Sequence, residues 1–136
     1  MSITLLANID VDELEKAIEF YSSALGLRLG RRLQGDIAEM LGASSTLYLL
    51  AKPARSSVSV RIPQQRDYRR HWTPVHLDFV VADIHAAVQK AQAAGAQLEG
   101  SIQTHAWGHL ANLADPFGNG FCLIEFIGRG YDEIAN

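Results

Sequence analysis

A strand-like run at residues 75–84 carries His76 and Asp78, two positions apart, in a mostly apolar segment. Alternate residues of a strand point to the same side, so the imidazole and the carboxylate share a face. Near pH 7 a neutral imidazole can bind a metal or act as a general base; the other interpretation is a strand histidine hydrogen-bonded to a neighbour. Asn8 and Asp10 repeat the polar spacing near the N-terminus. We therefore expect all four side chains to face away from the helices, towards a small-molecule site.

The second candidate for chemistry is the thiol of Cys122, in an apolar run typical of a strand. A positive neighbour would lower the pKa of this thiol and make it a nucleophile. The structural interpretation, a small buried hydrophobe, is favoured by Ile124 and Phe126 on the same strand face.

The strand expected at 106–114 carries three further candidates. The indole of Trp107 can stack on a flat ligand or fill the core. Gly108 is a place for a bulge, so alternation along this strand does not fix which side chains point inward. The predicted ligand-binding residues are Asn8, Asp78, Trp107, His109, Asn112 and Cys122, and the predicted catalytic residue is His76.

These segments belong to a pattern that recurs after 70 residues. The apolar helical stripe Leu14, Ala17, Ile18 and Tyr21 has a counterpart in Ile84, Ala87, Val88 and Ala91. In both copies a strand precedes the stripe, an acidic residue begins the helix, and a glycine, Gly26 or Gly95, ends it. The pattern predicts a duplicated module of one strand, one helix and three strands.

The expected elements also set the module boundaries. They are a helix start capped by Asp12 and Glu15, a short helical turn at 35–42 and strands at 46–50, 58–62, 97–103, 106–114 and 120–127. The stretch 63–74, with two prolines and three arginines, predicts a linker between modules at about 1–62 and 75–127. We expect one domain over 1–136, closed by a polar tail from Gly128.

The composition excludes several classes of partner. A chain of 136 residues with 48% hydrophobic and 20% charged residues is ordinary for a globular protein. Its net charge of −3 is too small to indicate a nucleic acid or an acidic membrane as partner. One cysteine, no signal-peptide pattern and no long apolar run together favour a cytoplasmic protein.

Two further segments are Val11–Tyr21, followed by Leu25-Gly26-Leu27, and Asp115–Glu125, which begins with a turn signature. Together they resemble the vicinal oxygen chelate superfamily of glyoxalase I, bleomycin-resistance proteins, fosfomycin-resistance enzymes and extradiol dioxygenases. The resemblance implies an α+β fold in which two βαβββ modules form a curved mixed-sheet cup around a small-molecule site. It also implies a homodimer. In metal-using members four ligands line the cup, one from the first and one from the last strand of each module.

Carried onto this chain, three of the four ligand positions fall on Leu6, His76 and Cys122, and the fourth falls near Leu49. Two hydrocarbon side chains cannot bind a metal, whereas metal sites in proteins need several nitrogen, oxygen or sulfur donors. The resemblance therefore implies a degenerate site. We expect no cofactor and disfavour a divalent metal; if one binds, His76 is its ligand.

Three functions are consistent with these residues. The first is a superfamily protein that binds or transforms a small organic molecule without the usual metal. The second is a metal-dependent lyase or dioxygenase with unorthodox ligands such as Asn8, Asp78 or Cys122 beside His76. The third is a drug-sequestering protein of the resistance type, in which Trp107 and acidic residues hold the ligand.

Overall fold

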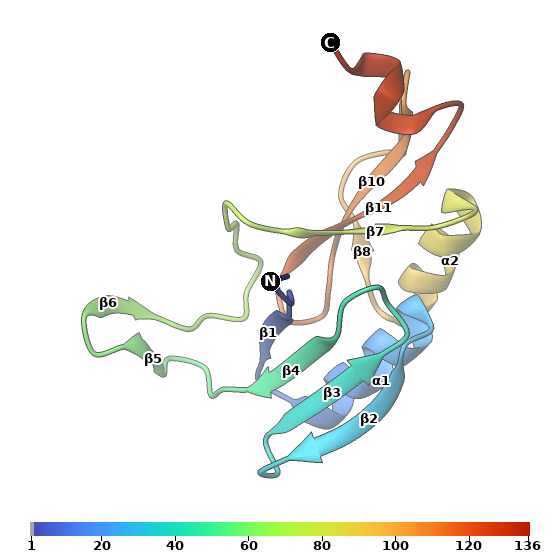
Figure 1. The fold of residues 1–136 in the computed structure, drawn as a ribbon. Coiled ribbons are helices and arrows are strands. Elements are labelled where there is room, and N and C mark those ends of the chain that lie inside the picture. Colours follow the sequence, from blue (N-terminus) through green and yellow to red (C-terminus); the bar gives the residue numbers. More distant parts are fainter. Residues whose placement is uncertain (1) are drawn as a thin grey trace. The chain divides into compact units, whose positions relative to one another are not determined.

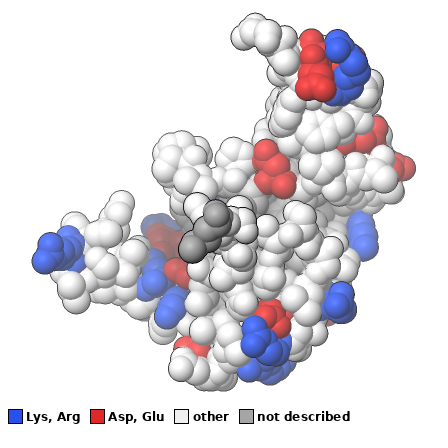
Figure 2. All heavy atoms as spheres, viewed as in Figure 1, with Lys and Arg blue, Asp and Glu red and all other residues white. Residues whose placement is uncertain are grey.

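The computed structural model describes residues 2–136, which form two compact units with the boundary between Arg69 and Arg70. Each unit holds one α-helix packed on one mixed β-sheet (Figure 1). No helix in the described part of the chain is long and apolar enough to cross a membrane. On the face seen in Figure 2, positive and negative side chains alternate in small groups, as a net charge of −3 suggests.

The first unit contains a four-stranded sheet and a separate hairpin. Its elements are β1 (Ala7–Val11), α1 (Leu14–Leu25), β2 (Arg28–Leu33), β3 (Ile37–Leu41), β4 (Leu47–Ala51), β5 (Ser57–Ser59) and β6 (Ile62–Gln65). The sheet order is β1-β4-β3-β2, with β1 parallel to β4 and the other pairs antiparallel. Strands β5 and β6 pair only with each other in this unit.

The second unit repeats this topology. Its elements are β7 (Leu77–Val80), α2 (Ile84–Ala94), β8 (Gln97–Leu98), β9 (Gln103–His105), β10 (Gly108–Ala114), β11 (Gly120–Phe126) and a 3₁₀-helix η1 (Gly130–Ile134). The order β7-β11-β10-β8 again has one parallel pair, β7 with β11, and β9 adds to β10. The predicted fold class, α+β with two βαβββ modules, is confirmed.

The two helices begin differently and end alike. Asp83 caps α2, because its carboxylate accepts a hydrogen bond from the backbone N–H of Ala86 at 3.2 Å. Helix α1 begins after Glu13, which makes no side-chain capping bond within residues 2–136, so the predicted Asp12–Glu15 capping box is wrong. Both helices end at left-handed glycines, Gly26 and Gly95, as predicted.

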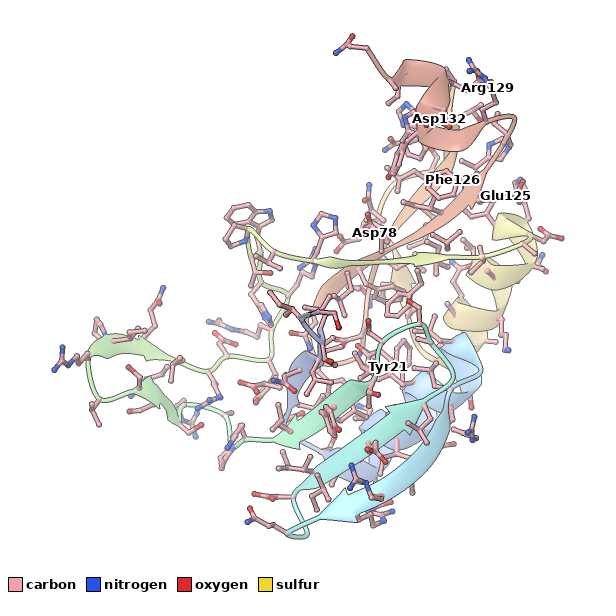
Figure 3. The ribbon with its side chains drawn as sticks, in the orientation of Figure 1. Tyr21, Asp78, Glu125, Phe126, Arg129 and Asp132 are labelled. Atoms are coloured by element: carbon pink, nitrogen blue, oxygen red, sulfur yellow. The ribbon has the colours of Figure 1, made fainter. Side chains whose placement is uncertain are left out.

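Each unit builds its core between its helix and one face of its sheet. The buried residues of α1 are Ala17, Phe20, Tyr21 and Ala24, and those of α2 are Ile84, Val88 and Ala91. In the first unit they pack where Leu47 and Leu49 of β4 are buried. Tyr21, labelled in Figure 3, is 1% exposed and meets Phe20 edge to face.

Four predicted segments differ from the structure. The strand expected at 97–103 forms only β8 and the first residue of β9. Residues 37–41, within the expected helical turn, form the central strand β3, and the expected strand at 58–62 is a hairpin whose second strand reaches Gln65, inside the predicted linker. The expected polar tail contains η1, whose Tyr131 packs against Trp107 and Phe126. These contacts between aromatic rings, which a mostly polar sequence does not reveal, hold the segment against β11 and the start of β10.

Candidate functional site

The sheet of the second unit has one face towards α2 and one away from it, here called the helix-free face. Glu125 on β11 accepts a hydrogen bond from the backbone N–H of Ile84, at the start of α2, at 2.9 Å. Glu125 therefore lies on the helix side, and Cys122, three residues earlier, lies on the helix-free face. Asp78 and Glu125 are labelled on their two neighbouring strands in Figure 3.

Three polar side chains form a row across the helix-free face. The register places Asp78 of β7 and Asn112 of β10 on either side of Cys122. Residues directly opposite one another on paired strands share a face, so this row comes from three strands of distant sequence. His76 joins it just before β7 begins, as its Nε2 lies 3.1 Å from Oδ1 of Asp78.

The row offers donors and acceptors close together. Cys122 Sγ donates to Asn112 Oδ1 at 3.0 Å. Donor atoms of His76, Asp78 and Cys122 all lie within 4.8 Å of one another. His76 and Asp78 are exposed, whereas Cys122 is 8% exposed, so a ligand would meet the imidazole and the carboxylate first.

The environment of Cys122 keeps its thiol protonated. Burial raises the pKa of the thiol to about 11, and the nearby negative charge of Asp78 adds to the rise. A cysteine nucleophile needs a lowered pKa and a positive neighbour. The geometry therefore favours a hydrogen-bond donor at this position over the nucleophile considered from the sequence.

Not all predicted ligand-binding residues meet at this row. His109 pairs with Glu125, so it lies on the helix side, where its Nδ1 is 3.0 Å from Oγ1 of Thr104. Trp107 stacks on His105, with ring centroids 4.9 Å apart and planes at 5°. Its aromatic surface is already used within the protein, and the structure does not bring either residue to Cys122. Asn8 belongs to the first unit.

The first unit has the corresponding row on the helix-free face of its own sheet. Asn8 of β1 pairs with Tyr48 of β4, which pairs with Glu39 of β3. Leu49, the counterpart of Cys122 expected from the sequence, pairs with Ile9 and is fully buried towards the helix. The sequence placed this position near Leu49; the register puts it at the adjacent Tyr48, so the side chain is a phenol and not the expected hydrocarbon.

In this first row, Tyr48 and Glu39 are hydrogen-bonded within the protein. Tyr48 donates to Glu39 Oε2 at 3.2 Å, while Arg31 donates to Glu39 from its backbone N–H and from Nε and Nη2, the last at 2.7 Å. The Arg31 guanidinium holds the pKa of Glu39 at about 2. The sequence analysis did not identify Arg31, Glu39 and Tyr48 as a group, because Glu39 was expected to lie in a helical turn and not in a strand. Alternation of Tyr48 between two leucines was the available signal.

A duplicated βαβββ module with one parallel strand pair in each sheet defines the vicinal oxygen chelate class of protein. The chain belongs to the glyoxalase-like domain family, whose model matches residues 7–124. No curated protein matches the chain in sequence.

Solved structures show the same fold. A glyoxalase/bleomycin resistance protein/dioxygenase family enzyme from Burkholderia phytofirmans superposes with a TM-score of 0.70 at 20% identity, over 90% of this chain and 97% of that one. Lactoylglutathione lyase from Agrobacterium tumefaciens gives 0.63 at 19%, over 92% and 94%. An antibiotic binding protein from a Streptomyces species gives 0.65 at 23%, over 93% and 98%. At these identities the likeness concerns the fold alone.

The residues of this chain do not fit the four-ligand metal arrangement that the resemblance implies. In the first module its positions are Leu6 and Tyr48, and the Tyr48 hydroxyl already donates to Glu39. In the second module His76 and Cys122 stand at ligand positions, with Asp78 as an added donor. An imidazole, a carboxylate and a thiol are donors that Zn²⁺ accepts, so any metal would depend on this one module.

Proposed function

We propose that this protein binds a small organic molecule on the helix-free face of its second module, without the four-ligand metal of its superfamily. The observation that carries the proposal is the row of His76, Asp78, Cys122 and Asn112, in which an exposed imidazole–carboxylate pair adjoins a neutral thiol bonded to an amide. A glyoxalase-like domain over 1–136 and a cytoplasmic location are parts of the same proposal.

The chemistry of the row suits recognition of a neutral or weakly polar ligand. The Asp78 carboxylate orients the imidazole of His76 through Nε2, leaving Nδ1 to accept a hydrogen bond from a ligand hydroxyl. Ile124, two residues after Cys122 on the same face, is buried and supplies apolar wall. A few placed polar groups in apolar surroundings are what small-molecule sites contain.

A second candidate function is a metal-dependent lyase or dioxygenase. The close grouping of the His76, Asp78 and Cys122 donor atoms favours it. Binding without turnover is instead supported by the likeness in fold to an antibiotic binding protein. These candidates differ in metal content and in whether a product forms.

The test combines metal analysis with binding of three probes. Purified protein is assayed for divalent metal, then titrated with catechol, with the hemithioacetal of glutathione and methylglyoxal, and with bleomycin, while products are followed by mass spectrometry. We expect well under one equivalent of metal and saturable binding of at least one probe, unchanged by a chelator. His76→Ala should weaken that binding about tenfold, through the loss of one hydrogen bond.

His85→Ala is the matched control, because His85 is exposed on α2, away from the row. Equal weakening by both changes would contradict the placement of the site. About one equivalent of bound metal, together with turnover lost on chelation, would replace the proposal by the metal-dependent candidate.

A further inference from the structure

A cavity lies in the first unit, beside the β5–β6 hairpin. Its volume is about 660 Å³, and its lining includes Asp12, Ala54, Arg55, Gln65, Arg66 and Tyr68. This size is within the range of small-molecule sites. Figure 2 shows positive and negative side chains close together where the hairpin joins the rest of the unit. Charged side chains therefore contribute to several sides of the cavity.

Most charges around this cavity are neutralised within the protein. Arg66 donates from Nε to Asp10 at 2.7 Å and is largely buried, with 16% of its side chain exposed. Arg69 is paired with Asp67 at 2.5 Å. These pairs shape the cavity wall and have little charge left for a ligand.

Arg55 is the exception among the cationic residues of the wall. Its guanidinium has no hydrogen-bond or ion-pair partner in residues 2–136 and lines the cavity. Its backbone is left-handed, with φ of 66°, and its N–H donates to the carbonyl of Arg66 at 2.7 Å. Left-handed backbone disfavours any residue with a β-carbon, so its occurrence at a non-glycine marks a place to look for function.

Asp12 is the anionic counterpart. Its carboxylate also lines the cavity and has no ion-pair or hydrogen-bond partner within the described chain. The ring of Tyr68, half-buried and held by donation of its hydroxyl to the Lys52 carbonyl at 2.6 Å, gives the cavity an aromatic wall. One free cation, one free anion and one ring thus surround the same space.

We propose that this cavity binds a zwitterionic small molecule of the amino-acid class, independently of the site on the second module. Arg55 holds its carboxylate by a two-pronged contact, Asp12 holds its ammonium group, and its side chain lies against Tyr68. A molecule with only one of the two charges leaves either the guanidinium or the carboxylate unmatched.

The test uses three probes of one shape. L-phenylalanine carries both charges, 3-phenylpropanoate lacks the ammonium group and 2-phenylethylamine lacks the carboxylate. Isothermal titration with the full chain should give a dissociation constant for L-phenylalanine at least about tenfold lower than for either analogue, since each analogue loses the charged contact with Asp12 or with Arg55. Arg55→Ala and Asp12→Asn should each raise the L-phenylalanine constant by a similar factor.

The controls are Arg61→Ala and Asp36→Asn, which remove exposed charges of the same unit outside the cavity. Both should leave the constant unchanged, and thermal unfolding should show that all four variants stay folded. L-phenylalanine binding no tighter than either analogue, binding unaffected by Arg55→Ala, or no binding at all would overturn the proposal. Its failure would leave the second-module site untouched, because that site shares no residue with this cavity.

Discussion

The chemical character of Cys122 depends on its neighbours. Its thiol donates to Asn112 and lies beside the Asp78 carboxylate, and both contacts favour the protonated form. The Arg31–Glu39 pair in the first unit is the opposite case, because a guanidinium stabilises the charged form of the carboxyl. Each environment predicts a measurable response to pH.

We expect the folded protein to react slowly with iodoacetamide at Cys122. A rise of the pKa from 9.0 to about 11 lowers the thiolate fraction at about pH 8 roughly hundredfold. Mass spectrometry of the alkylated protein, with and without urea, measures the two rates. Asp78→Asn should speed the folded-state reaction by removing a negative charge, whereas Asp132→Asn in η1 should not. Similar rates in folded and unfolded protein would contradict the protected thiol.

Glu39 should contribute to stability above about pH 4.5 and lose that contribution as the pH falls. Its pKa is lowered from 4.5 to about 2 in the folded state, so the folded form binds the proton less readily than the unfolded form does. Urea unfolding across this window should show a smaller acid-induced loss for Glu39→Gln than for the original chain. Glu19→Gln, at an exposed position of α1, should follow the original chain. Parallel loss in all three proteins would argue against the Arg31–Glu39 contact.

For single residues, the sequence predicted which side chains are polar better than it predicted the side of the sheet to which they point. His76 and Asp78 were expected on the same face of one strand, and the structure places them in contact. Alternation along a single strand is enough to predict this. The choice between Leu49 and Tyr48 needed the register of β1 with β4, which depends on pairing across 40 residues. His109 was similarly undetermined until its pairing with Glu125 was known.

The two helices provide an internal comparison of capping at the scale of elements. Asp83→Ala should lower the free energy of unfolding by about 1 kcal/mol, because the capped N–H of Ala86 loses its acceptor. Glu13→Ala should change it by less than about 0.5 kcal/mol, since Glu13 makes only an exposed contact of 3.8 Å with Lys16. Chemical denaturation of both variants gives the comparison, and equal effects would contradict the capping difference.

Strand β3 shows why local propensity was misleading. Ala38, Glu39 and Met40 are good helix formers, and the glycines around them suggested a short helix. In the structure they lie between β2 and β4, all three buried, with Glu39 bonded to Arg31 and Tyr48. Pairing with two strands supplies hydrogen bonds and burial that outweigh intrinsic preference.

For the whole molecule, the repeat was the strongest sequence signal and it gave the correct fold. Two amphipathic helices with matching strands before and glycines after them, 70 residues apart, required a duplicated topology. The candidate site was harder to predict from the sequence, because its residues come from three strands and only the pairing register of the sheet brings them together. The cavity lined by Arg55 and Asp12 gave no sequence signal, since the hairpin beside it fell partly in the expected linker.

The remaining prediction concerns assembly. Large apolar side chains are exposed in both units, among them Leu5 at 73%, Val60 at 103% and Trp72 at 80%. We propose that a second copy of the chain covers part of this surface, as in the homodimer expected from the resemblance. Size-exclusion chromatography with light scattering should give about twice the chain mass of 14.9 kDa. Val60→Asp should shift the equilibrium towards monomer, whereas Ser59→Asp, on the same hairpin, should not. A mass of one chain at every concentration would rule the dimer out.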